Sequence, residues 1–162
     1  MSSGPRSEPE RLVERLRELG WSLGVAESLT GGLVAASVVA VPGASAVFRG
    51  GIVAYATDLK SRLLGVDATL LDAHGPVHPR VARQMAEGIR RAVGESDAAD
   101  VGIATTGVAG PGPADGQPAG TVHIAVSTPL GSRVESLELS GDREQIRTEA
   151  AARAIALAID AL

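Results

Sequence analysis

Short apolar runs and helical segments alternate along this chain, and polar, glycine-rich turns separate them. An apolar run too short for a helix indicates a buried strand, whereas apolar residues spaced three and four apart indicate an amphipathic helix. Strands that alternate with helices favour an α/β fold, in which helices cover both faces of a sheet. This alternation constrains the architecture more than any other feature of the sequence.

The order of the elements makes the predicted architecture specific. The last two strands meet around Pro129-Leu130-Gly131, which is typical of an antiparallel hairpin at a sheet edge. Asp142 and Gln145 have the spacing of a capping box at the start of the final helix. We predict a three-layer α/β/α sandwich with a mixed, mainly parallel sheet and an antiparallel edge hairpin. The earlier predicted elements are helix Pro9–Gly20, strand Trp21–Ala26, helix Leu33–Val41, strand Gly51–Tyr55, a helix capped by Thr57 or Asp58 and ending at Leu64, helix Pro79–Val93 and strand Val101–Thr105.

Length, charge and cysteine usage limit the class of protein. The chain has 162 residues, with 15 Lys and Arg against 19 Asp and Glu, so its formal charge is −4. This length predicts a single domain at 9–162, after a polar segment at 1–8 that we expect to be a disordered tail. The acidic balance argues against nucleic acid as a partner. Cysteine is absent, which excludes disulfides and a cysteine nucleophile.

The longest uncharged stretch, residues 28–48, is long enough to span a bilayer. Its hydroxyl groups and Pro42-Gly43 argue against a membrane segment, and the polar first ten residues do not have the composition of a secretion signal. We therefore expect a cytoplasmic protein without a membrane partner.

Lys60 is the only lysine in a chain with 14 arginines, and the only tyrosine, Tyr55, lies five residues before it. The two basic residues are nearly exchangeable on solvated faces, but only lysine can become a neutral amine, because the pKa of arginine stays above about 12. One interpretation is that Lys60 transfers a proton. The other is retention by chance, with Tyr55 as an ordinary residue at the end of a strand.

Ser28 lies in a polar turn, residues 27–32, between a predicted strand and a predicted helix. Gly31 and Gly32 would let backbone N–H groups face an anion or an oxyanion. On position alone, the favoured interpretation is that Ser28 or Thr30 caps the next helix. The chain has no Gly-x-Ser-x-Gly, P-loop or dinucleotide-binding motif.

A serine nucleophile needs a base, and lysine is a better candidate here than histidine. His74, His78 and His123 are scattered, and a proline separates the first two, so we predict no metal site. Ser28 with Lys60 and Tyr55 then becomes the better catalytic set. In such sheets ligands bind at the carboxyl ends of the parallel strands. The Gly- and Pro-rich loop 107–120 follows one of these ends, and its length indicates function or mobility.

Five sequence blocks, in their order and spacing, resemble the CinA C-terminal domain family. They cover nearly the whole chain after about residue 10 and comprise Ala26–Gly32, Gly50–Tyr55 with Lys60 and Leu64–Val66, Thr106–Pro111, Pro118–Val122 and Gly141–Arg143. The resemblance implies a metal-free, cofactor-free amidohydrolase of pyridine-nucleotide recycling. Its substrate would be nicotinamide mononucleotide, which is deamidated to nicotinate mononucleotide and ammonia.

The resemblance also implies roles for individual residues. Ser28 would attack the carboxamide carbon, and Lys60, assisted or oriented by Tyr55, would transfer the proton. We expect the oxyanion hole at backbone N–H groups near Thr30, Gly31 and Gly32, since such groups suit an oxyanion. For the ribose-phosphate end of the nucleotide, which suits N–H groups and a guanidinium, the candidates are Thr106, Gly107, Gly110 and Arg143.

Three positions depart from the family pattern. Leu29 stands where Cys is frequent, His78 where Ser is usual, and Gln117 where Lys is common. These departures leave open an alternative function, a non-catalytic nucleotide-binding or regulatory module of the competence/damage-inducible type. We also expect a homodimer or a larger homo-oligomer, because the predicted hairpin leaves an exposed sheet edge.

Overall fold

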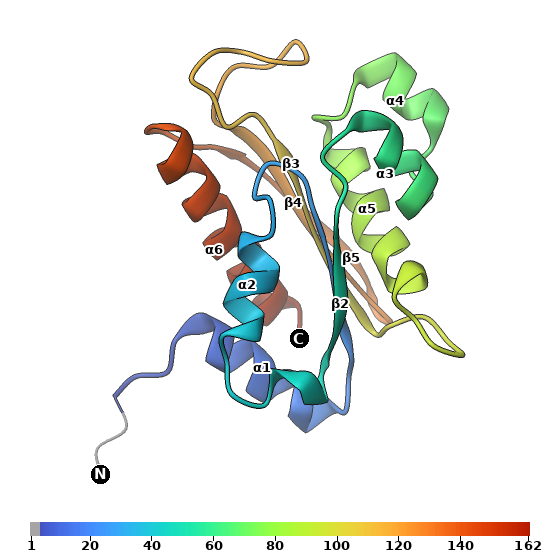
Figure 1. Ribbon diagram of the computed structural model, residues 1–162, viewed down its shortest axis with the longest axis vertical. Coiled ribbons are helices and arrows are strands. Elements are labelled where there is room, and N and C mark those ends of the chain that lie inside the picture. Colours follow the sequence, from blue (N-terminus) through green and yellow to red (C-terminus); the bar gives the residue numbers. More distant parts are fainter. Residues whose placement is uncertain (1–3) are drawn as a thin grey trace.

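The computed structural model describes residues 4–162 (Figure 1). The first three residues of the expected tail lie outside the described residues, and the first helix begins at Glu8. The elements in chain order are α1 Glu8–Leu19, β1 Leu23–Glu27, α2 Leu33–Val39, the 3₁₀ turn η1 Ala44–Ala46, β2 Phe48–Val53, α3 Thr57–Leu64, α4 Ala68–His74, α5 Pro79–Ala92, β3 Val101–Gly107, β4 Thr121–Thr128, β5 Gly131–Glu138 and α6 Arg143–Ala161.

The five strands form one mixed sheet in the order β2-β1-β3-β4-β5. Strand β1 pairs in parallel with both β2 and β3, whereas β4 is antiparallel to β3 and to β5. The β4–β5 hairpin therefore forms one edge of the sheet, as predicted. Parallel pairing of β1, β2 and β3 brings their carboxyl ends to the same end of the sheet.

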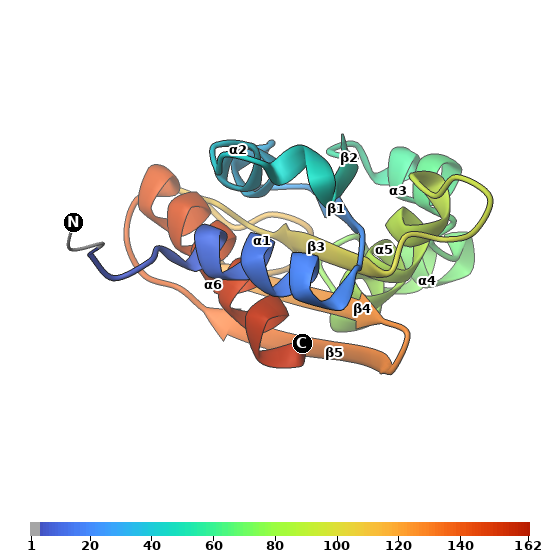
Figure 2. The ribbon, with the colours of Figure 1, turned by 90° about the horizontal axis from the view of Figure 1, so that it is seen from below.

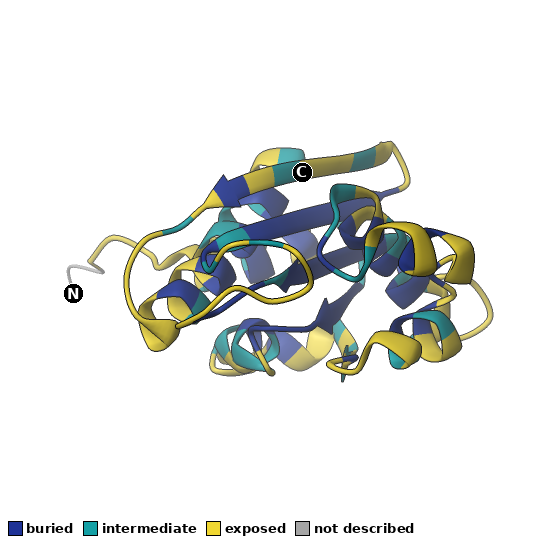
Figure 3. Cartoon of the chain, turned by 90° about the horizontal axis from the view of Figure 1, so that it is seen from above, coloured by how far each residue is buried: buried dark blue, intermediate teal, exposed yellow. Residues whose placement is uncertain are grey.

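Helices cover both faces of the sheet and complete the predicted sandwich. One face carries α1, α2 and α6, and the other carries α3, α4 and α5 (Figures 1 and 2). Each helical layer packs against the sheet through its own cluster of buried apolar side chains. The central strands are buried while β5 and the loops are largely exposed (Figure 3), so both cores lie between the sheet and its helices.

Small residues let α5 lie very close to its neighbours. A β-carbon added at Gly88 would lie 1.8 Å from the Leu64 carbonyl oxygen, and one added at Gly102 would lie 2.0 Å from the Ala86 carbonyl oxygen. The first glycine faces the end of α3 and the second lies on β3 beneath α5. Because protein interiors are close-packed, these approaches leave no room for a larger residue.

Strand β2 differs from its prediction. The sequence predicts a strand at Gly51–Tyr55, but β2 begins at Phe48, where Arg49 interrupts the apolar pattern. It is an edge strand in which every second residue is exposed, so its apolar signal is weak. Tyr55 consequently lies two residues beyond the strand instead of ending it.

Helix starts account for the other differences. Neither Thr57 nor Asp58 caps α3, because Ala56 is its N-cap residue. Helix α4 was not predicted, although the Asp67 side chain accepts a hydrogen bond from the Thr69 N–H and caps it. A short capped helix of seven residues has too few turns to show a clear periodicity.

We predict that Gly88→Ala lowers the free energy of unfolding by about 1–3 kcal/mol, because the added methyl group forces α5 away from the Leu64 carbonyl. Urea unfolding of the purified variant measures this change. The matched control is Gly50→Ala, whose β-carbon would make an ordinary contact of 3.7 Å with Val93. Equal stability of the two variants would contradict the close packing described above.

Candidate active site

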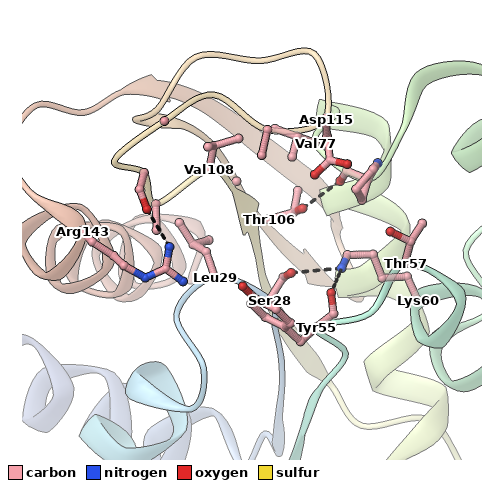
Figure 4. Close-up of a pocket in the computed structure, with 16 residues that line it drawn as sticks. Ser28, Leu29, Tyr55, Thr57, Lys60, Val77, Thr106, Val108, Asp115 and Arg143 are labelled. Carbon is pink, nitrogen blue, oxygen red and sulfur yellow. Dashed lines mark hydrogen bonds between the residues drawn. The ribbon is translucent and has the colours of Figure 1, made fainter.

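A cavity of about 190 Å³ lies at the carboxyl ends of the parallel strands (Figure 4). Segments that follow β1, β2 and β3 form its walls, together with the start of α6, as expected for an α/β sheet. Seven residues predicted from the sequence line it: Ser28, Tyr55, Lys60, Thr106, Gly107, Gly110 and Arg143. The fold thus brings together residues that are up to 115 positions apart, from Ser28 to Arg143.

The centre of the cavity is a contact between a lysine amine and a serine hydroxyl. Lys60 Nζ donates a hydrogen bond to Ser28 Oγ at 3.0 Å. It also donates to the carbonyl oxygens of Ala54, at 2.8 Å, and Tyr55, at 3.3 Å. All three bonds fix the end of a long side chain that begins on α3. Tyr55 thus holds Lys60 through its main chain, while its own side chain is 62% exposed.

Burial makes the Lys60 amine easier to deprotonate. The residue is 1% exposed, and this desolvation lowers the pKa of Lys60 from 10.5 to about 8, although the charge of Asp115 raises it. A substantial fraction of neutral amine is therefore present at slightly alkaline pH. A neutral amine can accept the proton of the neighbouring hydroxyl, which an ammonium cannot.

A buried carboxylate at the end of β1 fixes the turn that carries Ser28 to the start of α2. Glu27, 1% exposed, accepts hydrogen bonds from the N–H groups of Val34, at 2.9 Å, and Ala35, at 3.1 Å. Helix α2 has Gly32 at its N-cap and no capping side chain of its own. The carboxylate therefore caps α2 from β1, where the helix dipole also favours a negative charge.

Two further side chains tie down the same turn. On the sheet, Thr105 Oγ1 accepts from the Ser28 N–H at 3.4 Å and lies 2.8 Å from Thr30 Oγ1. From α6, Arg147 donates to the carbonyl oxygens of Leu29, at 2.8 Å, and Thr30, at 3.3 Å. The sequence did not predict these roles for Glu27, Thr105 and Arg147. A buried charge beside the candidate nucleophile was the one signal in the sequence that could have indicated the first of them.

The three residues expected to form an oxyanion hole do not line the cavity. Thr30 is fully buried, and the Gly31 N–H donates to the Ser28 carbonyl oxygen at 3.1 Å within the turn. Gly32 caps α2 with its backbone in the left-handed region, φ 107°. The interpretation favoured on position alone, that Ser28 or Thr30 caps α2, is wrong, because neither side chain bonds to the helix N-terminus.

The loop after β3 covers the cavity and is fastened at several points. Arg143 Nη1 donates to the Gly110 carbonyl oxygen at 2.7 Å, and at the end of β3, just before the loop, Thr106 Oγ1 donates to the Pro76 carbonyl oxygen at 2.7 Å. The backbones of Ala114 and Gln117 pair with each other at the tip of the loop. The loop thereby presents the side chain of Asp115 to the cavity (Figure 4).

The departures from the family pattern have local roles. Leu29 is buried and lines the cavity, whereas Gln117 does not line it. His78 Nδ1 accepts from the Arg80 N–H at 3.1 Å and caps α5, a role that serine also fills well. Burial, His74 and Arg80 lower the pKa of His78, which favours the neutral ring whose Nδ1 can accept this hydrogen bond.

The remaining histidine lies away from the cavity. His123 is buried on β4, with Nδ1 2.8 Å from Ser136 Oγ. Residues 4–162 contain no group of three or more His, Cys, Asp or Glu side chains placed to hold a metal ion. Within the same range, every helix is too short or too polar to cross a membrane.

Comparison with known proteins gives a consistent result. The CinA C-terminal domain matches residues 6–162. A CinA-like protein of Frankia casuarinae is 52% identical over 84% of the chain and 30% of its own length, and one from Anaeromyxobacter dehalogenans is 48% identical over 92% and 36%. The chain thus spans about a third of the length of these curated relatives.

Solved structures share the whole fold. A competence-damaged protein (CinA) superfamily protein of Klebsiella pneumoniae superposes with a TM-score of 0.88 at 33% identity, over 94% of both chains. A competence/damage inducible protein of Agrobacterium tumefaciens gives a TM-score of 0.84 at 33% identity, over 99% of this chain and 98% of that one.

We predict that Glu27→Gln lowers the free energy of unfolding by about 1–3 kcal/mol, because one of the two accepting oxygens becomes an NH2 group, which is a donor and faces a helix N–H. Thermal unfolding measures the loss. Glu138→Gln, an exposed substitution on β5, is the matched control and should change little. An unchanged melting temperature for Glu27→Gln would show that α2 does not depend on this cap.

The lowered pKa of Lys60 predicts a pH dependence of stability. Between about pH 8 and 10.5 the unfolded chain binds a proton that the folded chain has released, so the free energy of unfolding should rise with pH across this window. The full difference corresponds to about 3 kcal/mol, which is the cost of burying the ammonium at lower pH. Lys60→Met should lack this rise.

Urea unfolding of wild type and Lys60→Met at several pH values from about 7 to 10 tests this expectation. Other titrating groups contribute equally to both proteins and cancel in the difference. Parallel stability curves would mean that Lys60 titrates at its ordinary value in the folded protein.

Proposed function

The chain belongs to the CinA C-terminal domain family, and from this premise we propose that it hydrolyses the carboxamide of nicotinamide mononucleotide to nicotinate mononucleotide and ammonia. The observation that carries the proposal is the 3.0 Å contact between Lys60 Nζ and Ser28 Oγ. A hydroxyl beside a buried amine is the pairing that a serine nucleophile with a lysine base requires. The resemblance described above supplies the identity of the substrate.

The hydrogen bonds around the amine suit a neutral base. Neutral Lys60 has two N–H groups and one lone pair. The carbonyl oxygens of Ala54 and Tyr55 can accept from the two N–H groups, which leaves the lone pair for the Ser28 hydroxyl. In this arrangement Tyr55 orients the base through its main chain.

The reaction would proceed through a covalent intermediate. Lys60 takes the proton of Ser28 as Oγ bonds to the carboxamide carbon, and the carbonyl oxygen becomes an oxyanion. The resulting ammonium returns the proton to the amide nitrogen, the C–N bond breaks, and ammonia leaves. Water then attacks the Ser28 ester, with Lys60 again accepting a proton, and releases the carboxylate product and the free hydroxyl.

The dimensions and charges of the cavity are compatible with a nucleotide. Its volume of about 190 Å³ is below the roughly 300–1,000 Å³ of pockets that enclose a drug-sized ligand. The reacting ring would therefore be enclosed while the ribose-phosphate lies toward the open side. Arg143 is exposed at the start of α6. It is the candidate for binding the phosphate, since a guanidinium pairs well with phosphate.

The decisive experiment is ammonia release from nicotinamide mononucleotide by the purified protein without added metal. Ser28→Ala should abolish turnover but leave binding. Lys60→Arg should reduce turnover by about 10²–10⁴-fold, because arginine keeps the charge but cannot become a neutral base. The matched control is Ser45→Ala, which removes an exposed hydroxyl from the 3₁₀ turn.

The pH profile provides a separate test of the base. Because the neutral amine is the active form, kcat/KM should rise with pH and level off above about pH 8. A protein that the nucleotide stabilises thermally but that releases no ammonia would instead favour the nucleotide-binding or regulatory alternative.

A further inference from the structure

Three residues that line the cavity carry a formal charge: Lys60, Asp115 and Arg143. Among the ion pairs formed by residues 4–162, none includes Asp115 or Arg143. Figure 4 places Asp115 near Lys60 on one side of the cavity and Arg143 on the opposite side. The cavity therefore has a negative group on one side of the reacting serine and a positive group on the other.

Asp115 lies in the turn at the tip of the loop. Asp115 is the one described non-glycine residue with a positive φ, 51°, and the Ala114–Gln117 backbone pair closes the turn around it. A β-carbon added at Gly75 would lie 3.9 Å from the Asp115 carbonyl oxygen, so the loop tip rests against the segment between α4 and α5. Asp115 and Gly116, with φ 51° and 74°, form a two-residue turn of the Asp-Gly type, which readily takes positive φ at both positions.

Asp115 is exposed and forms no ion pair with another described residue. When Lys60 is the neutral base, it no longer offers a positive charge to this carboxylate. The carboxylate is then free to pair with a cationic group of a substrate bound next to the serine. We propose that Asp115 recognises a positively charged ring, so that the site selects N-ribosylated pyridinium carboxamides over nucleotides with a neutral ring.

This inference rests on the proposed function and specifies its substrate class. In an N-ribosylated nicotinamide the ring nitrogen is quaternary, and the carboxamide is attached to the same ring. With the carboxamide carbon at Ser28 Oγ, the ring would lie in the cavity that Asp115 also lines. Arg143 on the opposite side would then face the phosphate.

The same arrangement links binding to activation of the base. Asp115 raises the pKa of Lys60, and a cation bound between the two groups would counteract that effect and add repulsion of its own. The apparent pKa of kcat, which reports the bound state, should then lie below that of kcat/KM, which reports the free protein.

A pair of ligands that differ in ring charge tests the proposal. Nicotinamide mononucleotide has a cationic ring, and its 1,4-dihydro form has the same carboxamide, ribose and phosphate on a neutral ring. Calorimetric binding to Ser28→Ala, with and without Asp115→Asn, measures affinity without turnover. Loss of the carboxylate should lower the affinity for the cationic ligand by about tenfold at low salt. The affinity for the neutral ligand should fall much less.

Two further variants test whether the charge of Asp115 causes the preference for the cationic ring. Asp115→Glu keeps the charge and should restore most of the preference for the cationic ring. Asp160→Asn removes an exposed carboxylate near the far end of α6 and is the matched control. In kinetic assays of the protein with Ser28 intact, Asp115→Asn should also lower the apparent pKa of kcat/KM, because Asp115 raises the pKa of Lys60.

Each outcome is informative. An equal loss of affinity for both ligands, or no loss for either, would overturn the role of Asp115. The proposed function would still stand if the wild-type protein binds and hydrolyses nicotinamide mononucleotide. A wild-type protein that neither binds nor hydrolyses nicotinamide mononucleotide would overturn the proposed function, and the assigned substrate class with it.

Discussion

The burial of one amine next to one hydroxyl is the constraint on which the rest of the site depends. An ammonium removed from water is costly unless its hydrogen-bond donors find acceptors. The chain supplies these acceptors from three places: a side chain after β1 and two main-chain carbonyls after β2. Only the parallel pairing of β1 with β2 brings these segments together at the same end of the sheet.

The nucleophile's turn is more firmly held than its sequence suggests. Glu27 and α2 stabilise each other, since the helix offers two N–H groups to the carboxylate and the carboxylate caps a helix that has no cap of its own. Thr105 on the sheet and Arg147 on α6 bind the same turn from opposite sides. A hydroxyl fixed in this way needs little reorganisation before it reacts.

Two features could be predicted from the sequence: the layered fold, from the alternation of strands and helices, and the candidate base, from its unusual residue type. The alternation of elements led to the sandwich, and the isolation of Lys60 among arginines led to the residue that contacts Ser28. The sequence did not predict which groups act through the main chain. The Gly31 N–H is used within the turn, and Tyr55 holds Lys60 through a carbonyl that every residue type has.

Long-range partners were missed for a related reason. Thr105 and Arg147 lie 77 and 119 positions after Ser28, and nothing in their local sequence distinguishes them from an ordinary strand threonine or helix arginine. Their roles arise from strand order and helix placement, which fix tertiary contacts that no local pattern encodes. The start of β2 was missed because an edge strand has only one weakly apolar face.

The single lysine has a practical consequence for spectroscopy. Isotope labelling of lysine alone would place one reporter in these 162 residues, at the buried amine that contacts Ser28. Its side-chain resonance would need no assignment and would titrate without overlap from any other lysine. The ionisation of this group could therefore be followed directly in the folded protein, before any substrate is known.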